Sequence, residues 1–394
     1  MFSNDTVKYI FPTIPIRQTK KPDVNSQVEV DVSSADKKKL KNEREKCVDF
    51  FENVRKHLGR KGNAVDERLN TSDACERFVS ELVNLVDTYA SSIASVVAKL
   101  PQFASWQYYY WSSSLADAQQ MAFDDYRYEL LGMYYNVGAC LMNIAQYLLS
   151  VRVTVGSLSV LEKDSYRVLI KAAGYFHICG EIVDNMKSHE IGVAQVPIPL
   201  DTAKALQVLL ESLALAQAQE IGVSKAFTAD SKEAADTTAR LSHQLFLMYE
   251  AARNNAQRVS TRNEEFIKVS TLIVVKADVF RALAYQHAAS HVMTKTPDAA
   301  LSILAQGQEY AKILEDYLTK SQKGKIKIPY NGERFVELSS ATVKNNTERI
   351  NKINSLVHRA KPAATKVPLP AAQPLATRPD ISLPFRLEDK KEQE

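Results

Sequence analysis

The hydrophobic pattern is clearest in the middle of the chain. From Phe123 onward, apolar side chains recur every three or four residues, the spacing that places them on one face of an α-helix. These positions are Leu130, Tyr134, Val137, Leu141, Ile144 and Leu148. The same segment holds Gly132 and Gly138, which allow a neighbouring element to approach closely. The pattern predicts a long central helix that is buried on several sides.

Proline spacing predicts further long helices on both sides of this segment. No proline occurs between Pro101 and Pro197, or between Pro199 and Pro297, and both windows are rich in strong helix formers. Candidate helix starts are Asp201 or Thr202, Asp230 with Glu233 in a capping box, and Thr296 before Pro297. The last start separates helices over about 269–293 and 298–319. Paired antiparallel helices of this kind are the unit of tetratricopeptide-like solenoids, although the chain shows no regular self-repeat.

The two ends of the chain have a different character. Alternating apolar and acidic residues over Val28–Val32 predict a short strand, and Val7–Phe11 is a second, weaker candidate. At the other end, six prolines lie between Pro362 and Pro384. This composition predicts an extended arm rather than a core element.

Composition is that of an ordinary globular protein and excludes several classes. Among 394 residues, 45% are hydrophobic and 24% are charged, so the chain can bury a core. The net charge of +4 is weaker than that of dedicated nucleic-acid binders, and we expect no nucleic-acid partner. The four cysteines form no C-x-x-C pair, so we expect reduced thiols. No run of 18 apolar residues is present, and no membrane span is expected.

The candidate chemistry does not support an enzyme. His287 and His291 have a spacing that can bind a metal, but the run lacks the glutamate of a metalloprotease. We interpret them as two histidines on a solvated helix face, and we expect no metal and no cofactor. Glycine-rich phosphate loops and nucleophile-elbow motifs are absent from the sequence. No pair of carboxylates is singled out by its context, so we expect no catalytic residues.

An aromatic cluster over Trp106–Trp111 lacks interleaved basic residues, which disfavours stacking on bases. We interpret it as a packed junction before a helix. Basic runs lie at Lys37–Lys46 and at Lys320–Lys327. Each is a solvated helix end or a surface for anionic lipid or an acidic partner, and the sequence leaves both open.

Two segments carry a resemblance to a known family. Asp124–Leu148 resembles the central helix of the Bro domain (Bro-one) family, with Glu129 followed by Tyr135-Asn136-Val137-Gly138-Ala139. Leu213–Phe227 contains Ala-Gln-Ala-Gln-Glu, a second motif of that family, at the expected distance. Val275–Tyr310 is similar to the family's helical hairpin. The resemblance covers most of residues 7–385.

The resemblance implies a mainly α fold, a curved, boomerang-like helical solenoid with a tetratricopeptide-like core and a small N-terminal β-sheet. It implies one Bro domain over residues 1–385, with a helical core at about 36–360 and an extended C-terminal arm at about 361–385. Residues 386–394 would form a charged tail. From this layout we expect a stand-alone Bro domain.

The resemblance also implies a non-catalytic adaptor in endosomal sorting and membrane remodelling. Family members bind the C-terminal amphipathic helix of an ESCRT-III filament subunit of the Snf or charged-multivesicular-body type. Such binding places apolar side chains of a helix in an apolar patch on the concave face. We expect a cytoplasmic protein that reaches endosomal membranes peripherally through its partner.

Carried over to this chain, the patch falls on two predicted helices. It comprises Gly222, Val223, Lys225, Thr237 and Leu241. Gly222 stands where relatives often have an aromatic residue, and a two-residue shift is needed to place Thr237 and Leu241. We expect Val223 and Leu241 to face outward together on the hollow side.

Other functions remain open at this point. One is a signalling scaffold of the rhophilin type, and another is a helical-repeat protein with an unrelated peptide partner. An unrecognised enzyme or an RNA-binding solenoid would rest only on the histidine pair, the aromatic cluster and the basic runs.

Overall fold

The computed structural model describes most of the chain and divides it into two compact units. The described residues are 9–58, 67–115, 120–150, 158–187, 203–228, 232–259 and 261–387. The N-terminal unit comprises Thr13–Ala214, Arg258–Phe266 and Arg378–Glu394, and the C-terminal unit comprises Met1–Pro12, Leu215–Gln257 and Ile267–Thr377. Helix α5 (Lys204–Thr228) contributes its first turns to the N-terminal unit and the remainder to the C-terminal unit.

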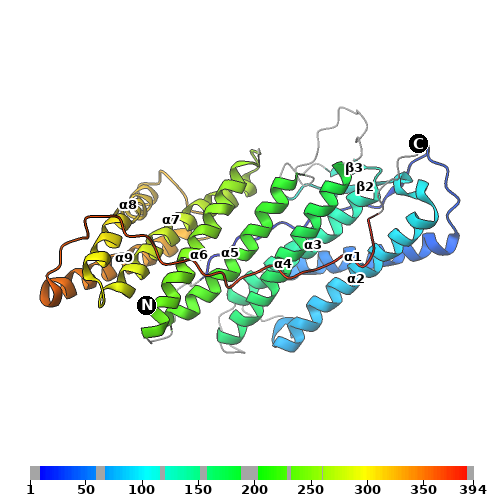
Figure 1. Ribbon diagram of the computed structural model, residues 1–394. Helices are drawn as coiled ribbons and strands as arrows, with labels where there is room; N and C mark the ends of the chain where they lie inside the picture. Colours follow the sequence, from blue (N-terminus) through cyan, green and yellow to red (C-terminus); the bar gives the residue numbers. More distant parts are fainter. Residues whose placement is uncertain are drawn as a thin grey trace. The chain divides into compact units, whose positions relative to one another are not determined.

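The N-terminal unit is built on long helices that lie roughly side by side (Figure 1). They are α1 (Ser34–Leu58), α2 (Ser72–Lys99), α3 (Tyr126–Ser150) and α4 (Leu158–Lys187). Helix α3 is buried on nearly all faces, which confirms the prediction of a central helix. Gly138 allows the ring of Phe176 on α4 to approach within about 2.8 Å of where a Cβ would stand.

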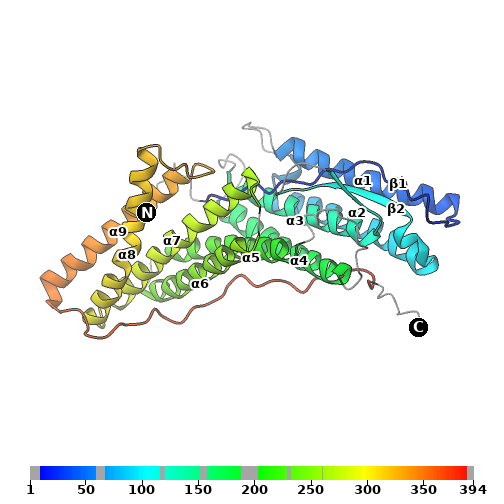
Figure 2. The same ribbon diagram turned by 90° about the horizontal axis from the view of Figure 1, so that it is seen from above.

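A small antiparallel sheet completes this unit, beside α1 and α2 (Figure 2). Its strands are β1 (Asp23–Val24), β2 (Gln107–Ser112) and β3 (Gln120–Phe123), in the order β1-β2-β3. Strand β2 packs on α3 because Gly132 leaves room for Trp111, whose ring would lie 2.3 Å from an added Cβ. The aromatic cluster is therefore packed as expected, but it forms a strand rather than a junction before a helix.

Polar side chains of α3 hold an extended N-terminal segment. Asn136 accepts from the Arg17 amide (2.8 Å) and donates to the Arg17 carbonyl (3.0 Å). Asn143 makes the same pair of bonds with Ile14, at 2.9 and 2.8 Å. Each amide satisfies one donor and one acceptor of the segment, as a neighbouring strand would. The segment is thereby fixed along α3, and directly after it Thr19 forms an isolated antiparallel bridge with Trp111 of β2.

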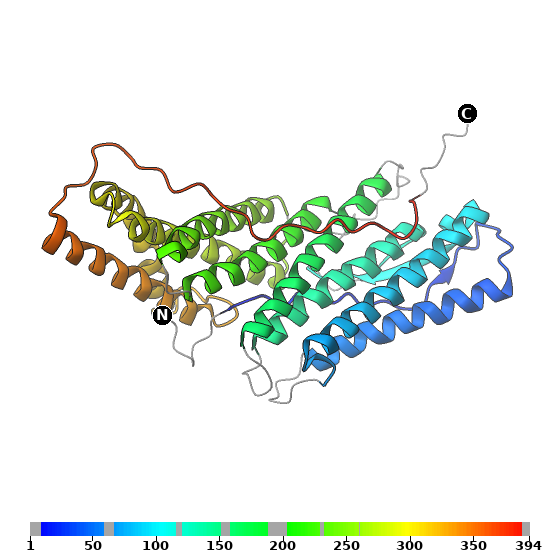
Figure 3. The same ribbon diagram turned by 60° about the horizontal axis from the view of Figure 1, so that its bottom comes forward.

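The C-terminal unit continues as antiparallel helices with short turns (Figure 3). They are α6 (Lys232–Gln257), α7 (Glu264–Val292), α8 (Pro297–Gln322) and α9 (Gly332–Ile353). Helix α8 begins at Pro297, as predicted, although the Thr296 side chain makes no capping bond. Buried side chains of α7, α8 and α9, among them Ala289, Leu304 and Ile350, share one hydrophobic cluster.

The last part of the chain is an extended arm that begins after α9. In the C-terminal unit, Gln306 of α8 donates to the Val367 carbonyl (3.1 Å) and Ser302 donates to the Thr365 carbonyl (3.1 Å). In the N-terminal unit, Ile381 packs over Gly174 of α4. The arm contains no helix or strand over residues 361–387, and side chains as well as backbone groups of α6 and α8 bond to its backbone.

The mainly α fold with a small sheet is confirmed, but the predicted strands are wrong. Val28–Val32 forms no strand, although its side chains alternate between more and less buried as the pattern indicated. Residues 9–11 are also not a strand, and residues 7 and 8 lie outside the described part of the chain. The proposed caps Asp201, Thr202 and Asp230 lie outside it as well. The longest strand that does form, β2, consists of aromatic and polar residues in which apolar and polar positions do not alternate.

Candidate functional site

Helix α5 carries the Ala-Gln-Ala-Gln-Glu motif, and its two faces form the candidate site. Successive helical residues are rotated by about 100°. Gln219 and Gly222 therefore share one face, which contacts the arm and which we call the arm face. Glu220 and Val223 share another, which lines a pocket and which we call the pocket face.

On the arm face, the side-chain amide of Gln219 fixes the arm. Its Oε1 accepts from the backbone amides of Leu375 (2.8 Å) and Ala376 (3.0 Å). Its Nε2 lies within hydrogen-bond distance of the carbonyl oxygens of Leu241 (3.3 Å) and Gln373 (3.2 Å). Gln219 is fully buried, so these four contacts satisfy a group that water cannot reach.

The arm also occupies the space above Gly222. A Cβ on Gly222 would lie 2.3 Å from Cδ2 of Leu375, so the glycine makes room for this leucine. On α6, Arg240 and His243 each place a nitrogen near a carbonyl oxygen of the arm, at 3.4 and 2.7 Å. The arm thus crosses both α5 and α6 where the predicted patch lies.

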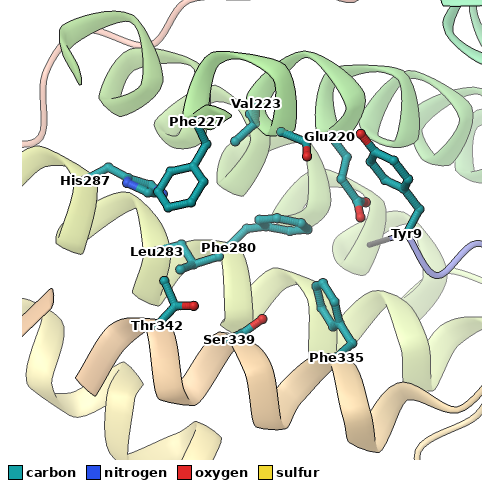
Figure 4. Close-up of a pocket in the computed structure, with 11 residues that line it drawn as sticks. Tyr9, Glu220, Val223, Phe227, Phe280, Leu283, His287, Phe335, Ser339 and Thr342 are labelled. Carbon is teal, nitrogen blue, oxygen red and sulfur yellow. The ribbon is translucent and has the colours of Figure 1, made fainter. Parts of the chain in front are cut away.

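The pocket face opens into a small, mostly apolar cavity of about 60 Å³. Side chains of α5, α7, α9 and the N-terminal segment point into it (Figure 4). Its apolar wall consists of Val223, Phe227, Phe280, Leu283 and Phe335. A cavity that binds benzene measures about 150 Å³. This pocket therefore fits the end of an aliphatic side chain rather than an aromatic ring.

A buried ion pair lies at one end of the pocket. Nζ of Lys276 on α7 donates to Oε2 of Glu220 at 2.7 Å, and the Tyr249 hydroxyl donates to the same oxygen at 2.6 Å. Burial raises the pKa of the Glu220 carboxyl, while Lys276 and Tyr249 oppose that shift. Burial lowers the pKa of Lys276, and Glu220 opposes that shift. The two partners thus sustain each other's charge in a site without solvent.

His287 closes the other end of the pocket, next to the ring of Phe227. Burial lowers the pKa of His287 to about 4, so the imidazole is neutral at physiological pH. His291 instead places Nε2 3.3 Å from Oδ1 of Asp236. The interpretation of two solvated histidines is therefore wrong for His287, since it packs among aromatic side chains.

The structure does not place Val223 and Leu241 outward as expected. Val223 is 7% exposed and Leu241 is 4% exposed. Val223 points into the pocket, whereas the Leu241 backbone contacts Gln219 on the arm face. The expectation of a shared outward patch is wrong. Val223 lies on the pocket face of α5, whereas Leu241 lies on α6, beside the arm face of α5.

The other three predicted residues lie in different environments. Gly222 is buried beneath Leu375, Lys225 is half-buried, and Thr237 is exposed on α6. Thr237 precedes Arg240 by one turn and so lies along the side of α6 that the arm contacts. Of the five residues, Thr237 alone is exposed.

Sequence reasoning missed the residues that organise this site. Gln219 and Glu220 stand as polar residues inside an apolar run, a signal that they are satisfied internally. Lys276, in the run Val274-Val275-Lys276-Ala277, gives the same signal on α7. Leu375 gives none, since it is one aliphatic residue in a proline-rich segment.

Replacing Gln219 with Leu is expected to release the arm around Leu375. The backbone amides of Leu375 and Ala376 lose their acceptor, and an unsatisfied buried group costs about 1–3 kcal/mol. Hydrogen–deuterium exchange of these two amides should accelerate roughly tenfold to hundredfold. Gln306→Leu is the matched control, because Gln306 contacts the arm elsewhere and accepts from neither amide. Unchanged exchange in Gln219→Leu would contradict the role assigned to this side chain.

The described residues contain neither a cluster of metal-binding side chains nor a membrane-spanning helix. Within that part of the chain, no three His, Cys, Asp or Glu side chains gather closely enough to hold a metal ion. None of its helices combines the length and hydropathy that crossing a bilayer requires.

Comparison with known proteins places this geometry in a family. The sequence matches the BRO1-like domain over residues 11–393. The chain belongs to the BRO1-like domain family. No curated protein matches by sequence. The predicted resemblance is thereby confirmed over nearly the whole chain.

Solved structures of BRO1-like domains share the fold. The ALIX BRO1 domain in complex with CHMP4C is 17% identical, with a TM-score of 0.64, and the match covers 97% of this chain and 98% of that one. A Bro1 domain described for endosomal targeting is 15% identical, with a TM-score of 0.60 and coverage of 94% and 92%. ALIX with the SIVmac239 late-domain peptide PYKEVTEDL is 15% identical at a TM-score of 0.63, covering 97% of this chain and 50% of that one.

Proposed function

We propose that this BRO1-like protein is a non-catalytic adaptor that binds the C-terminal amphipathic helix of an ESCRT-III filament subunit, of the Snf or charged-multivesicular-body type. The observation that carries the proposal is the likeness of the fold to an ALIX BRO1 domain solved with CHMP4C. The Ala-Gln-Ala-Gln-Glu motif adds support, since its Gln219 holds the arm at Leu375, an aliphatic residue that is 46% exposed. The protein would act in endosomal sorting, on membranes reached through its partner.

The binding surface that we propose is the arm at Leu375, where it covers α5, together with the adjoining stripe of α6. On α6, Leu247 lies seven residues after Arg240 and four after His243, on the side of the helix that the arm contacts. Leu247 is 41% exposed, and Leu375 of the arm is 46% exposed. These two exposed aliphatic side chains suit the apolar face of a peptide helix.

Two buried residues of the predicted patch, Gly222 and Leu241, lie beneath this surface and hold its elements in place. Leu241 anchors α6, and Gly222 seats Leu375, so neither needs to touch the partner. An Asp at Leu241 would introduce a charge at a site that is 4% exposed, and it would test folding rather than binding. Thr237 is the better position, because a substitution there leaves the core intact.

Thr237→Arg is expected to weaken binding of synthetic ESCRT-III C-terminal helices tenfold or more. A long charged side chain at this exposed position obstructs an apolar peptide face and must lose water on contact. Isothermal titration calorimetry with a panel of such peptides gives the dissociation constants, and thermal unfolding verifies that the variant is folded.

The matched control is Thr88→Arg, an exposed threonine on α2 in the N-terminal unit. It introduces the same side chain far along the chain from α6 and should bind as the wild type does. The proposal fails if no peptide of this class binds the wild type, or if the two arginine variants bind alike.

A further inference from the structure

The end of α9 exposes an unusual pair of apolar side chains. After Ile353 the helix closes with a single wider turn over Asn354–His358. Leu356 and Val357 in this turn are 68% and 70% exposed. Among the described residues, no other large hydrophobic side chain exceeds 57%. Scattered exposed leucines are ordinary, but two adjacent and nearly uncovered aliphatic residues mark a contact surface.

Hydrogen bonds fix the backbone of this turn, so it is not a frayed helix end. The Asn354 side chain donates to the Ala360 carbonyl (3.0 Å) and accepts from the Ala360 amide (2.9 Å). The Arg359 amide donates to the Asn354 carbonyl at 2.6 Å. Arg359 itself adopts a left-handed conformation, with φ of 54°. These bonds hold the backbone in a shape that presents Leu356 and Val357 to solvent.

The chain on either side of this pair carries charge of one sign. Between Glu348 and Asp380 the chain has no carboxylate, but it has six lysines and arginines. Four of them are exposed and form no salt bridge with any carboxylate of the described chain: Lys352, Arg359, Lys361 and Lys366. The turn lies at the outer end of the C-terminal unit, at the left of Figures 1 and 3. It is therefore accessible to a surface much larger than a peptide.

We propose that this turn, Leu356–Val357 with Lys352, Arg359 and Lys361, docks on an anionic lipid surface. Two aliphatic side chains enter the boundary between headgroups and acyl chains, while the surrounding cations pair with lipid phosphates and carboxylates. A projecting turn with apolar residues at its apex suits a flat, deformable surface, whereas an acidic protein partner would have to supply a matching hollow. The proposal does not depend on ESCRT-III binding, because it involves neither α5 nor α6.

Vesicle sedimentation of the full chain tests this proposal. Vesicles of phosphatidylcholine with phosphatidylserine should bind the wild type, and vesicles of phosphatidylcholine alone should bind it far more weakly. Leu356→Ser/Val357→Ser should reduce partitioning about tenfold. Lys352→Ser/Lys361→Ser should reduce it about fivefold per charge, an effect that salt diminishes. Leu158→Ser/Ile267→Ser removes two other exposed aliphatic side chains and should bind as the wild type does.

Three outcomes would overturn the proposal. One is a wild type that ignores phosphatidylserine, and another is a serine pair at 356 and 357 that binds as well as the wild type. The third is that the wild type binds no vesicles but binds an acidic protein, and that these variants no longer bind that protein. Thr237→Arg should retain vesicle binding, and Leu356→Ser/Val357→Ser should retain peptide binding. Failure of this proposal is thus distinguishable from failure of the proposed function.

Discussion

Lys276→Met is expected to destabilise the C-terminal unit by about 3–5 kcal/mol, since breaking a buried ion pair leaves one charge uncompensated. The Lys276 side chain is 2% exposed and the Glu220 side chain 4% exposed, at 2.7 Å from each other. Methionine retains the volume and removes the charge. Urea unfolding, followed by circular dichroism, measures the free energy of unfolding.

Loss of Lys276 should also change how stability depends on pH. Burial already raises the pKa of Glu220, and the variant lacks the cation that opposes this shift. A carboxyl with a folded pKa above its unfolded value binds more protons when folded, so stability is present at low pH and declines as pH rises. The variant should therefore be relatively more stable in acid than at neutral pH.

The double variant Glu220→Leu/Lys276→Met is the control for this prediction. Removing both charges replaces the pair with apolar groups, and such replacements are often neutral. The double variant should be clearly more stable than Lys276→Met. If the free energy of unfolding of Lys276→Met lies within about 1 kcal/mol of the wild-type value, the ion pair does not stabilise the fold as expected.

Glu129→Leu is expected to cost a similar amount, about 3–5 kcal/mol, in the N-terminal unit. The Glu129 carboxylate is fully buried on α3 and accepts three hydrogen bonds. They come from Arg44 Nε (2.7 Å), the Tyr89 hydroxyl (3.1 Å) and Trp111 Nε1 (2.7 Å). Without the carboxylate, Arg44 Nε, the Tyr89 hydroxyl and Trp111 Nε1 lose this acceptor. Among the described residues, the buried guanidinium of Arg44 then keeps only the Thr19 hydroxyl and no counter-charge at this site.

Tyr89→Phe provides the matched comparison for Glu129→Leu. It removes one of the three donors and leaves the carboxylate paired, so we expect a loss of about 1 kcal/mol. Thermal and urea unfolding of both variants give the difference. Equal destabilisation by the two changes would contradict the view that Glu129 joins α1, α2 and β2 to α3.

The helices were predictable because their signals are local. Leu130, Tyr134 and Leu141 repeat at the helical period, and Pro297 begins α8 where a first-turn proline predicts it. The strands were not, because pairing depends on residues far apart in the chain. Val28–Val32 has the alternation of a strand but finds no partner, whereas Asp23 pairs with Tyr108.

The site was predictable only in its outline. The Ala-Gln-Ala-Gln-Glu motif located α5, but the accessibility of its neighbours depends on the arm, which returns 156 residues after Gln219. No local pattern indicates that Leu375 rests on Gly222. Val223 and Leu241 were therefore assigned to an open patch, although their environments are closed by residues from distant segments.

The pairing of Ile14 and Arg17 with α3 has a consequence for biosynthesis. Their partners Asn143 and Asn136 are translated 129 and 119 residues later. At about 5–20 residues per second, a nascent chain waits roughly 6–25 s between the two events. Ile14 and Arg17 are thus synthesised well before these native contacts can form, and chaperones can engage them during that interval.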